Sequence, residues 1–210
     1  MKQSGSWTFR RLSEMPGCEA LVPQTSRLIY ESGADYYDTL FGSRELALAR
    51  LAAWVTRTSS AFACDRITLA LVNASIAGIA LELSGKDLPD RQRADILHLI
   101  KETESSRREL VLQKLDMIRL MTQRVRSDEY YLRSLSVEKA FRGCGLGRAL
   151  LERYIDNGTT VGFCRFRLDV RGDNLVAINL YRSVGFDISN ELTVPQTGWK
   201  LCSMVLRKSK

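Results

Sequence analysis

The sequence lacks the features that mark several large classes of protein. No apolar run approaches the roughly 20 residues that cross a bilayer. The first residues, MKQSGSWTFRR, lack the continuous apolar core of a signal peptide. Together these absences argue against a membrane partner and predict a cytoplasmic protein. There is also no internal repeat and no low-complexity linker, so residues 1–210 are expected to form one domain.

Cysteine and histidine are too few and too scattered to predict a metal site. The 5 cysteines contain no CxxC pair, which argues against a disulfide framework and against zinc. They are Cys18, Cys64, Cys144, Cys164 and Cys202, and reduced structural thiols are expected. The 1 histidine, His98, lies in a charged helical pattern, where a solvated or packed side chain is expected. No metal is therefore predicted.

Positive charge exceeds negative charge, but it is not concentrated. Lys and Arg number 31 against 24 Asp and Glu, which gives a net charge of +7. This balance is compatible with nucleic acid and also with any anionic ligand. The basic residues are spread along the chain apart from the terminal RKSK, and no zinc-finger spacing or aromatic-interleaved basic stripe is present. Nucleic acid is therefore not expected as the main partner.

Apolar periodicity predicts the elements of the first half of the chain. A strand is expected over 7–12, and helices over Val22–Glu31 and from Ser43, the predicted N-cap, to about 58. The YYDTLFG segment, 36–42, between these helices is interpreted as a packed turn. Apolar runs at 67–73 and 75–85, joined by a short link, predict a hairpin whose faces are both covered.

Residues from about 88 to 126 are helical and heavily charged. Pro89 suits a first helical turn, and a break near Thr103–Ser106 divides the segment into two helices. An amphipathic covering layer is the expectation, with a substrate lid or a dimer surface as alternatives.

The second half of the chain alternates strands with helices. Strands are expected over 130–137, 166–170 and 199–207. One helix is expected to end at Gly158, and another to run over 174–184 and end at Gly185. Asp169 lies inside a predicted strand and is interpreted as structural.

Three alternate glycines stand where a helix begins, in the stretch FRGCGLGRALLERY from Phe141 to Tyr154. The first amides of a helix have no intrahelical partner, and the helix dipole places partial positive charge there. Glycine lets the backbone approach a ligand closely, and Arg142 and Arg148 add full charges. The stretch therefore predicts a phosphate-bearing ligand. Its spacing matches neither a Walker phosphate loop nor the dinucleotide-binding fingerprint.

R-x-x-G-x-G, running from Arg142 to Gly147, resembles the acetyl-CoA signature of the GNAT superfamily of N-acetyltransferases. A second stretch agrees in order and spacing, since Asn174, Ala177, Leu180-Tyr181 and Gly185-Phe186 resemble the family's N-x-x-A-x-x-L-Y…G-F pattern. The two stretches cover about Tyr131 to Phe186.

The resemblance implies an α/β (α+β) fold. Its sheet is mixed, mostly antiparallel, six- to seven-stranded and flanked by helices, and it is splayed between strands four and five. The segment about 88–126 becomes an enlarged helical insertion before strand four, and about 130–188 becomes the acetyl-CoA-binding core.

The resemblance also implies where acetyl-CoA binds as the acetyl donor. The pantetheine arm would pair as a false strand with Leu135, Ser136 and Val137. The pyrophosphate would rest on the loop residues Arg142, Gly143, Cys144, Gly145, Leu146, Gly147 and Arg148. Asn174 would lie beside the arm, and it fits equally well as a helix N-cap.

Direct attack of a neutral amine on the thioester is the implied chemistry. Tyr181 occupies the family's general-acid position, and the amide of Val137 or a neighbour would polarise the carbonyl. The glutamate that many relatives carry on the fourth strand is absent from Tyr131, Arg133 and Ser134. The general base is therefore open, with Glu82, Glu129 or a water chain as candidates.

The acceptor cannot be named from the sequence. An amine-bearing small molecule, a protein N-terminus and a lysine side chain are all open. Tyr36, Tyr37, Asp38 and Phe41 form an aromatic-acidic cluster that could hold a cationic amine. A non-catalytic acetyl-CoA sensor of the same fold is the alternative function, and a homodimer is possible.

Overall fold

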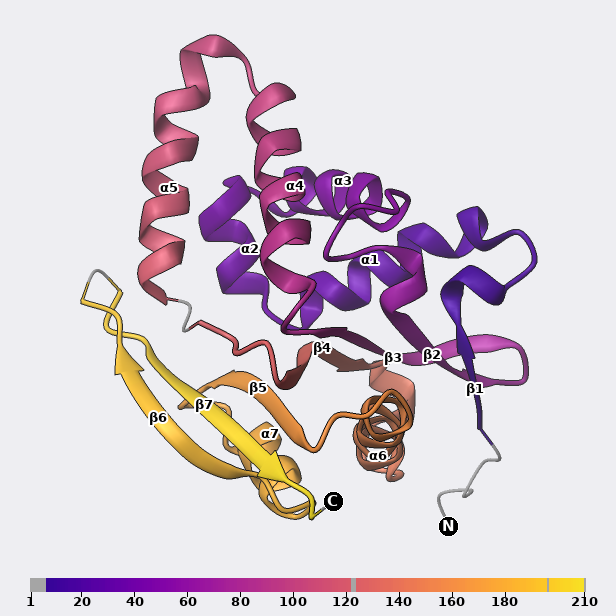
Figure 1. Cartoon of the computed structure of the whole chain (residues 1–210). Helices are drawn as coiled ribbons and strands as arrows, with labels where there is room; N and C mark the ends of the chain where they lie inside the picture. Colours follow the sequence, from indigo (N-terminus) through magenta and orange to yellow (C-terminus); the bar gives the residue numbers. More distant parts are fainter. Residues whose placement is uncertain (1–6, 122–123, 196, 210) are drawn as a thin grey trace.

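A seven-stranded sheet with the order β1-β2-β3-β4-β5-β7-β6 runs through the molecule (Figure 1). The computed structural model describes residues 7–121, 124–195 and 197–209. The strands are β1 (Thr8–Arg11), β2 (Ile67–Val72), β3 (Ser75–Ser84), β4 (Glu129–Val137), β5 (Arg165–Arg171), β6 (Asp187–Thr193) and β7 (Lys200–Arg207). Every neighbouring pair is antiparallel except β4 with β5, which is parallel. The predicted mixed, mostly antiparallel sheet is confirmed.

Helices cover both faces of the sheet, with α1 to α5 on one face and α6 and α7 on the other (Figure 1). The helices are α1 (Val22–Glu31), α2 (Ala34–Phe41), α3 (Arg44–Val55), α4 (Leu88–Lys101), α5 (Arg108–Met121), α6 (Leu146–Thr160) and α7 (Leu175–Arg182). Short 3-10 turns are η1 (Leu12–Glu14), η2 (Cys18–Leu21), η3 (Cys64–Arg66), η4 (Ser105–Arg107) and η5 (Lys139–Phe141).

Side-chain size on β2 and β3 differs between the two faces. Large side chains such as Leu69 and Ile79 pack in the core beneath α1 to α3, whereas Ala70 and Ala80 pack in the core with α6. A Cβ added at Gly78 would lie 2.9 Å from the Leu150 Cδ1 atom of α6. Small residues on this face therefore let α6 approach the sheet closely.

Parallel pairing between β4 and β5 stops early. It runs from Glu129 with Arg165 to Leu132 with Leu168, yet β4 continues to Val137 and β5 continues to Arg171. The predicted splay between the fourth and fifth strands is confirmed. We call the unpaired stretches, 133–137 of β4 and 169–171 of β5, the β4–β5 divergence.

Several local predictions are confirmed at the level of single residues. Helix α1 has the predicted limits, and the Ser43 side chain caps α3 by accepting from the Leu46 amide at 3.3 Å. Asn73 and Ala74 both have positive φ, 49° and 64°, as a two-residue hairpin turn requires.

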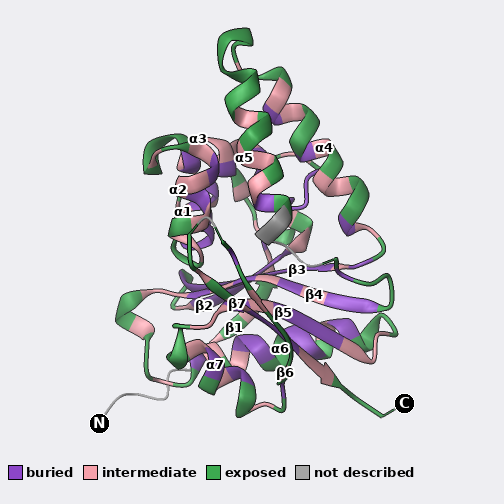
Figure 2. Ribbon diagram, turned by 90° about the vertical axis from the view of Figure 1, so that its left-hand side faces the viewer, coloured by how far each residue is buried: buried purple, intermediate pink, exposed green. Residues whose placement is uncertain are grey.

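Charged residues cover most of the exposed α4–α5 hairpin, which projects from the body of the molecule (Figure 2). The predicted break falls between Lys101 and Arg108, and Pro89 lies in the first turn of α4. The hairpin's inner residues, Leu88, Leu99 and Ile118, are buried in the core under α1 to α3.

Three local expectations were wrong, and one strand was missed. The 36–42 segment is not a turn. All of it except Gly42 belongs to α2, which runs from Ala34 to Phe41. Helix α6 continues through Gly158 to Thr160, and α5 ends at Met121 rather than near 126, with 122–123 outside the described residues. Strand β6 was not predicted, because its sequence DISNELT is polar and pairs on one side only.

No helix in the described ranges combines the length and the apolar character that a membrane span requires. In the same ranges, no group of three or more His, Cys, Asp or Glu residues could hold a metal ion.

Gly158 lies where α6 approaches the sheet closely, and it gives a test of this packing. A Cβ at this position would lie 2.6 Å from both Phe166 Cε1 and Tyr130 Cδ1. Gly158→Ala should therefore lower the free energy of unfolding by about 1–3 kcal/mol, although glycine to alanine in an open helix normally stabilises. Urea denaturation measures this change. Asp156→Ala, on the exposed side of α6, is the control and should stay within about 0.5 kcal/mol; equal stabilities of the two variants would contradict the close approach.

Candidate functional site

The edge of β4 that borders the divergence offers free backbone groups. Glu138 donates its amide to the Ala77 carbonyl oxygen at 2.9 Å, so it faces β3. Successive residues of an antiparallel strand alternate in direction, so Ser136 also faces β3, whereas Leu135 and Val137 face the divergence. The Val137 carbonyl oxygen accepts from Arg142 Nε at 2.8 Å. Ser136 therefore does not present its backbone on the open edge.

The glycine loop after β4 leaves its backbone amides without hydrogen bonds among the described residues. Gly143 and Gly145 have φ of 73° and 93°, a left-handed conformation that other residues rarely adopt. The amides from Gly143 to Arg148 have no hydrogen-bond partner among the described residues, and the first bonded amide is that of Ala149, which donates to Gly145. These donors and the α6 dipole together make an anion site.

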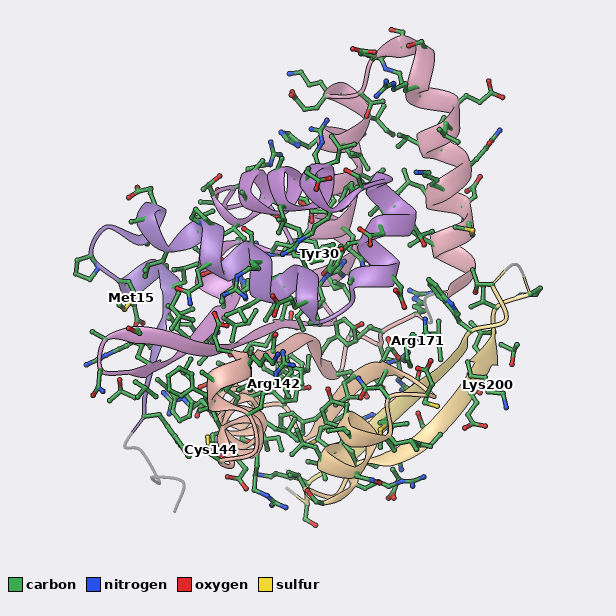
Figure 3. The ribbon with its side chains drawn as sticks, turned by 180° about the vertical axis from the view of Figure 1, so that it is seen from behind. Met15, Tyr30, Arg142, Cys144, Arg171 and Lys200 are labelled. Atoms are coloured by element: carbon green, nitrogen blue, oxygen red, sulfur yellow. The ribbon has the colours of Figure 1, made fainter. Side chains whose placement is uncertain are left out.

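Two arginines flank the loop and are held by contacts at the protein surface. Arg142 lies near Glu31 of α1, with 3.9 Å between the charged atoms, and Figure 3 shows it at the end of α6 close to Cys144. Arg148 donates to the Ser183 hydroxyl at 2.8 Å. Both side chains are about half exposed, so they can turn toward an anion at little cost.

Gly147 brings three elements together at the start of α6. A Cβ there would lie 3.3 Å from Leu180 Cδ2 of α7 and 3.8 Å from Val137 Cγ2 of β4. The glycine loop, the end of β4 and α7 therefore meet at one place. Asn174 caps α7, with its Oδ1 accepting from the Ala177 amide at 3.1 Å.

Tyr181 lies on the buried side of α7. It is 8% exposed, and its ring is 6.3 Å from that of Phe186. Its hydroxyl has no hydrogen-bond partner among the described residues. Burial raises the pKa of the Tyr181 phenol to about 12, so the group remains protonated at neutral pH.

Glu82 lies in the core beside α6. It is fully buried and forms an ion pair with Arg11 at 2.5 Å. One of its oxygens also accepts from the Asn157 amide at 2.6 Å. Burial raises the pKa of this carboxyl group, against the effect of Arg11. Glu82 is thus buried together with the residues that pair with it, and its carboxylate is not exposed to solvent.

Glu129 lies at the beginning of β4, at the opposite end of the strand from Val137. It is 1% exposed and pairs with Arg165 at 3.2 Å and Arg167 at 3.7 Å. It also accepts from the Arg126 amide at 2.8 Å. These contacts hold β4, β5 and the segment before β4 together.

A polar cluster at the point where β4 and β5 part was not recognised from the sequence. Asp169 is the first residue of β5 beyond the last β4–β5 pair. It accepts from the Tyr131 hydroxyl at 3.1 Å, from Arg167 at 3.1 Å and from the Ser203 hydroxyl at 2.5 Å. Its side chain remains 24% exposed. Sequence alone could not find this cluster, because it depends on where the strand pairing ends.

The aromatic-acidic cluster of α2 is mostly engaged in packing. Asp38 accepts from the Tyr30 hydroxyl through both oxygens, at 3.0 and 2.9 Å. The Tyr37 ring stacks on Phe41 with centroids 6.4 Å apart, and burial raises the Tyr37 pKa to about 12. Tyr36 keeps part of its surface exposed and packs against Tyr37 edge to face.

Comparison with known proteins gives two kinds of likeness. A family model described as Acetyltransferase (GNAT) family matches residues 110–186. A [ribosomal protein bS18]-alanine N-acetyltransferase of Salmonella typhimurium is 45% identical over 67 residues, which are 32% of this chain and 43% of the relative. This chain thus matches less than half the length of that relative.

Solved structures agree over nearly the whole chain. An N-acetyltransferase from Staphylococcus aureus Mu50 aligns with a TM-score of 0.71 and 17% identity, over 95% of this chain and all of that one. The NatC complex bound to Gag peptide and CoA aligns with a TM-score of 0.58 and 14% identity, over 97% of this chain and 99% of that one. Residues 110–186 of this chain are thus similar to the Acetyltransferase (GNAT) family, and the chain as a whole shares the fold of these solved structures.

Proposed function

We propose that this protein is an N-acetyltransferase that transfers an acetyl group from acetyl-CoA to a primary amine. One observation carries the proposal. The unpartnered amides from Gly143 to Arg148 follow closely along the chain after the open edge of β4 at Leu135 and Val137. A nucleotide-linked diphosphate suits the first feature, and an arm that contains amide bonds suits the second. The NatC complex, which has the same fold, was solved with bound CoA, and this adds support.

The cofactor would bind from the glycine loop inward. Its pyrophosphate would accept from the loop amides, with Arg142 and Arg148 as counter-ions, and its pantetheine arm would run along β4 from Val137 toward Arg133. The Arg142 side chain donates to the Val137 carbonyl oxygen. It would have to leave this oxygen and turn toward the pyrophosphate when the pantetheine arm pairs with β4. Asn174 caps α7 next to this path.

The chemistry is acyl transfer by direct attack. The amine nitrogen forms a bond to the thioester carbon, the carbon–sulfur bond breaks, and the amine loses a proton. The Leu135 or Val137 amide would stabilise the negative charge on the carbonyl oxygen. Tyr181 would donate its proton to the leaving thiolate, and its raised pKa keeps that proton in place at neutral pH.

Asp169 is the carboxylate best placed to take the amine proton, directly or through a water. It lies at the divergence and is partly exposed, and the Tyr131 hydroxyl orients it. Glu82 and Glu129 are the other candidates. All three carboxylates pair with arginine, but Glu82 and Glu129 are buried, whereas Asp169 is partly exposed. A base must reach its substrate, and this requirement favours Asp169.

A protein N-terminus is the acceptor class that the relatives support. The Salmonella relative is a [ribosomal protein bS18]-alanine N-acetyltransferase, and a relative from Mycobacterium tuberculosis is an N-alpha-acetyltransferase. The alternative function is a sensor that binds acetyl-CoA without turnover. The ion pairs of Glu82 and Glu129 favour this alternative, because they hold both carboxylates out of reach.

Loss of the loop conformation should abolish cofactor binding. Gly145→Val replaces a residue with φ of 93°, and the altered backbone should remove the amide cradle. The wild-type protein should be stabilised by CoA, by about 2.7 kcal/mol at a concentration one hundred times the Kd, and the variant should not. Thermal denaturation with and without CoA measures this.

Gly162→Val is the matched control. Gly162 follows the C-terminal end of α6 and has a φ of 90°. A Cβ added at Gly162 would meet open space, as it would at Gly145. It should incur a similar strain and keep the response to CoA. Equal CoA stabilisation of both variants would exclude the proposed binding site.

Turnover separates the enzyme from the sensor. Thiol release from acetyl-CoA should depend on an amine, and Tyr181→Phe should lower kcat by roughly 10²–10⁴-fold while CoA still stabilises the variant. The phenol donates only when protonated, so its contribution should persist up to a pH near its pKa of about 12. The kcat of the wild-type protein should therefore show no decline from this group between pH 8 and 10.5. No thiol release over a panel of amines, with normal CoA binding, would establish the sensor.

Asp169→Asn tests the base. It should lower kcat at neutral pH by roughly 100-fold, because the amide cannot accept the amine proton but keeps a similar shape. Asp187→Asn removes an exposed carboxylate of β6 and is the control, with kcat unchanged. Full activity of Asp169→Asn would show that Asp169 is not the general base, and that a water chain or another carboxylate takes the amine proton.

A further inference from the structure

Arg133 occupies a distinctive place on β4. It is the first β4 residue beyond the last β4–β5 pair. The register with β3 shifts at this point, from Leu81 with Ser134 to Glu82 with Leu132, so Arg133 has no opposing residue on β3. Its guanidinium carbon lies 4.4 Å from the centre of the Phe62 ring. Phe62 packs against Tyr37 of α2, so this contact places the Arg133 side chain on the α2 side of the sheet.

Arg133 lacks the kind of counter-ion that Arg11 and Arg167 have. Arg11 pairs with Glu82, and Arg167 pairs with Glu129 and Asp169. No carboxylate of the described residues lies within ion-pairing distance of Arg133, and its Nε atom is buried without a hydrogen-bond partner. The carboxylate that acts on it from farther away, Asp95, accepts from the Ala61 amide at 2.9 Å.

Hydroxyl groups surround this cation instead of carboxylates. The groups that interact with it electrostatically, besides Asp95, are the phenols of Tyr36, Tyr37 and Tyr131. Arg133, Tyr36 and Tyr131 each keep part of their surface exposed. A cation removed from water is costly unless an anion pairs with it, whereas a guanidinium and phenols together provide several donors for a carboxylate.

The same face of β4 also leads to the candidate base. Tyr131, two residues before Arg133, donates to Asp169. Alternate residues on a strand are roughly 7 Å apart, so an amine near Asp169 and an anion near Arg133 would be separated by only a few bonds. A cation beside the amine also favours its neutral, nucleophilic form.

We infer that Arg133 binds a carboxylate of the acceptor, so that the preferred acceptors carry a carboxylate within a few bonds of the reacting amine. This inference rests on the proposed acetyl transfer. The carboxylate can belong to a small amino acid or to an acidic residue next to a peptide's N-terminus. A polyamine is disfavoured, because its second cation would lie beside Arg133.

Matched acceptors that differ only in the carboxylate test the inference. One pair is β-alanine and β-alaninamide, and the other is the C-terminally amidated peptides Ala-Asp-Gly and Ala-Asn-Gly. The wild-type protein should prefer the carboxylate member of at least one pair by tenfold or more in kcat/KM. The pair that shows the preference identifies the source of the carboxylate.

Arg133→Gln should remove this preference by raising KM for the carboxylate acceptor, while kcat for the neutral acceptor stays within about threefold. Arg133→Lys should keep part of the preference, because it keeps the charge but loses the two-pronged geometry. Arg153→Gln removes another arginine stacked on an aromatic ring, 6.0 Å from Phe9, and should leave the preference unchanged. CoA stabilisation shows that each variant is folded.

Two results would overturn the assignment of Arg133 alone: equal kcat/KM for both members of both pairs in the wild-type protein, or a preference that survives in Arg133→Gln. Absence of turnover with every amine, together with normal CoA stabilisation, would instead overturn the proposed acetyl transfer and this inference with it.

Discussion

The early end of the β4–β5 pairing is the constraint on which the rest of the site depends. Two parallel strands that hydrogen-bond as far as Leu132 and Leu168 and then part leave backbone donors and acceptors without protein partners. Such groups are costly unless water or a ligand satisfies them. The glycine loop continues directly from this edge, so free amides of a strand and of a helix N-terminus follow one another along the chain.

Buried ion pairs hold the paired ends of these strands in place. Arg11 and Asn157 secure Glu82 in the core beside α6, and Glu129 joins the paired ends of β4 and β5 through two arginines. Breaking such a pair leaves an uncompensated buried charge, at a cost of about 3–5 kcal/mol. The strands are therefore fixed at one end and free at the other, and the position of the divergence is set.

Sequence reasoning succeeded where the determinant is local. The limits of α1, the Ser43 cap and the two-residue turn at Asn73 and Ala74 follow from periodicity, capping and turn chemistry, and the structure has all three. The glycine loop could also be predicted, because its residues are contiguous.

It failed where the determinant is the pairing of distant segments. Gly158 was expected to end a helix, yet it serves a close contact with Tyr130 and Phe166. The polar β6 was missed because its pairing with β7 is invisible in its own residues. Asp169 and Arg133 owe their positions to the last β4–β5 pair and to a bulge, neither of which has a local signal.

The α4–α5 hairpin leaves the sheet and returns to it at almost the same point, since the Gly85 amide donates to the Glu129 carbonyl oxygen at 2.8 Å. Neighbouring antiparallel strands need only a short turn to connect them. The pairing of β3 with β4 therefore does not require the excursion between them, and the hairpin contributes instead through the side chains that it adds to the core and through Asp95.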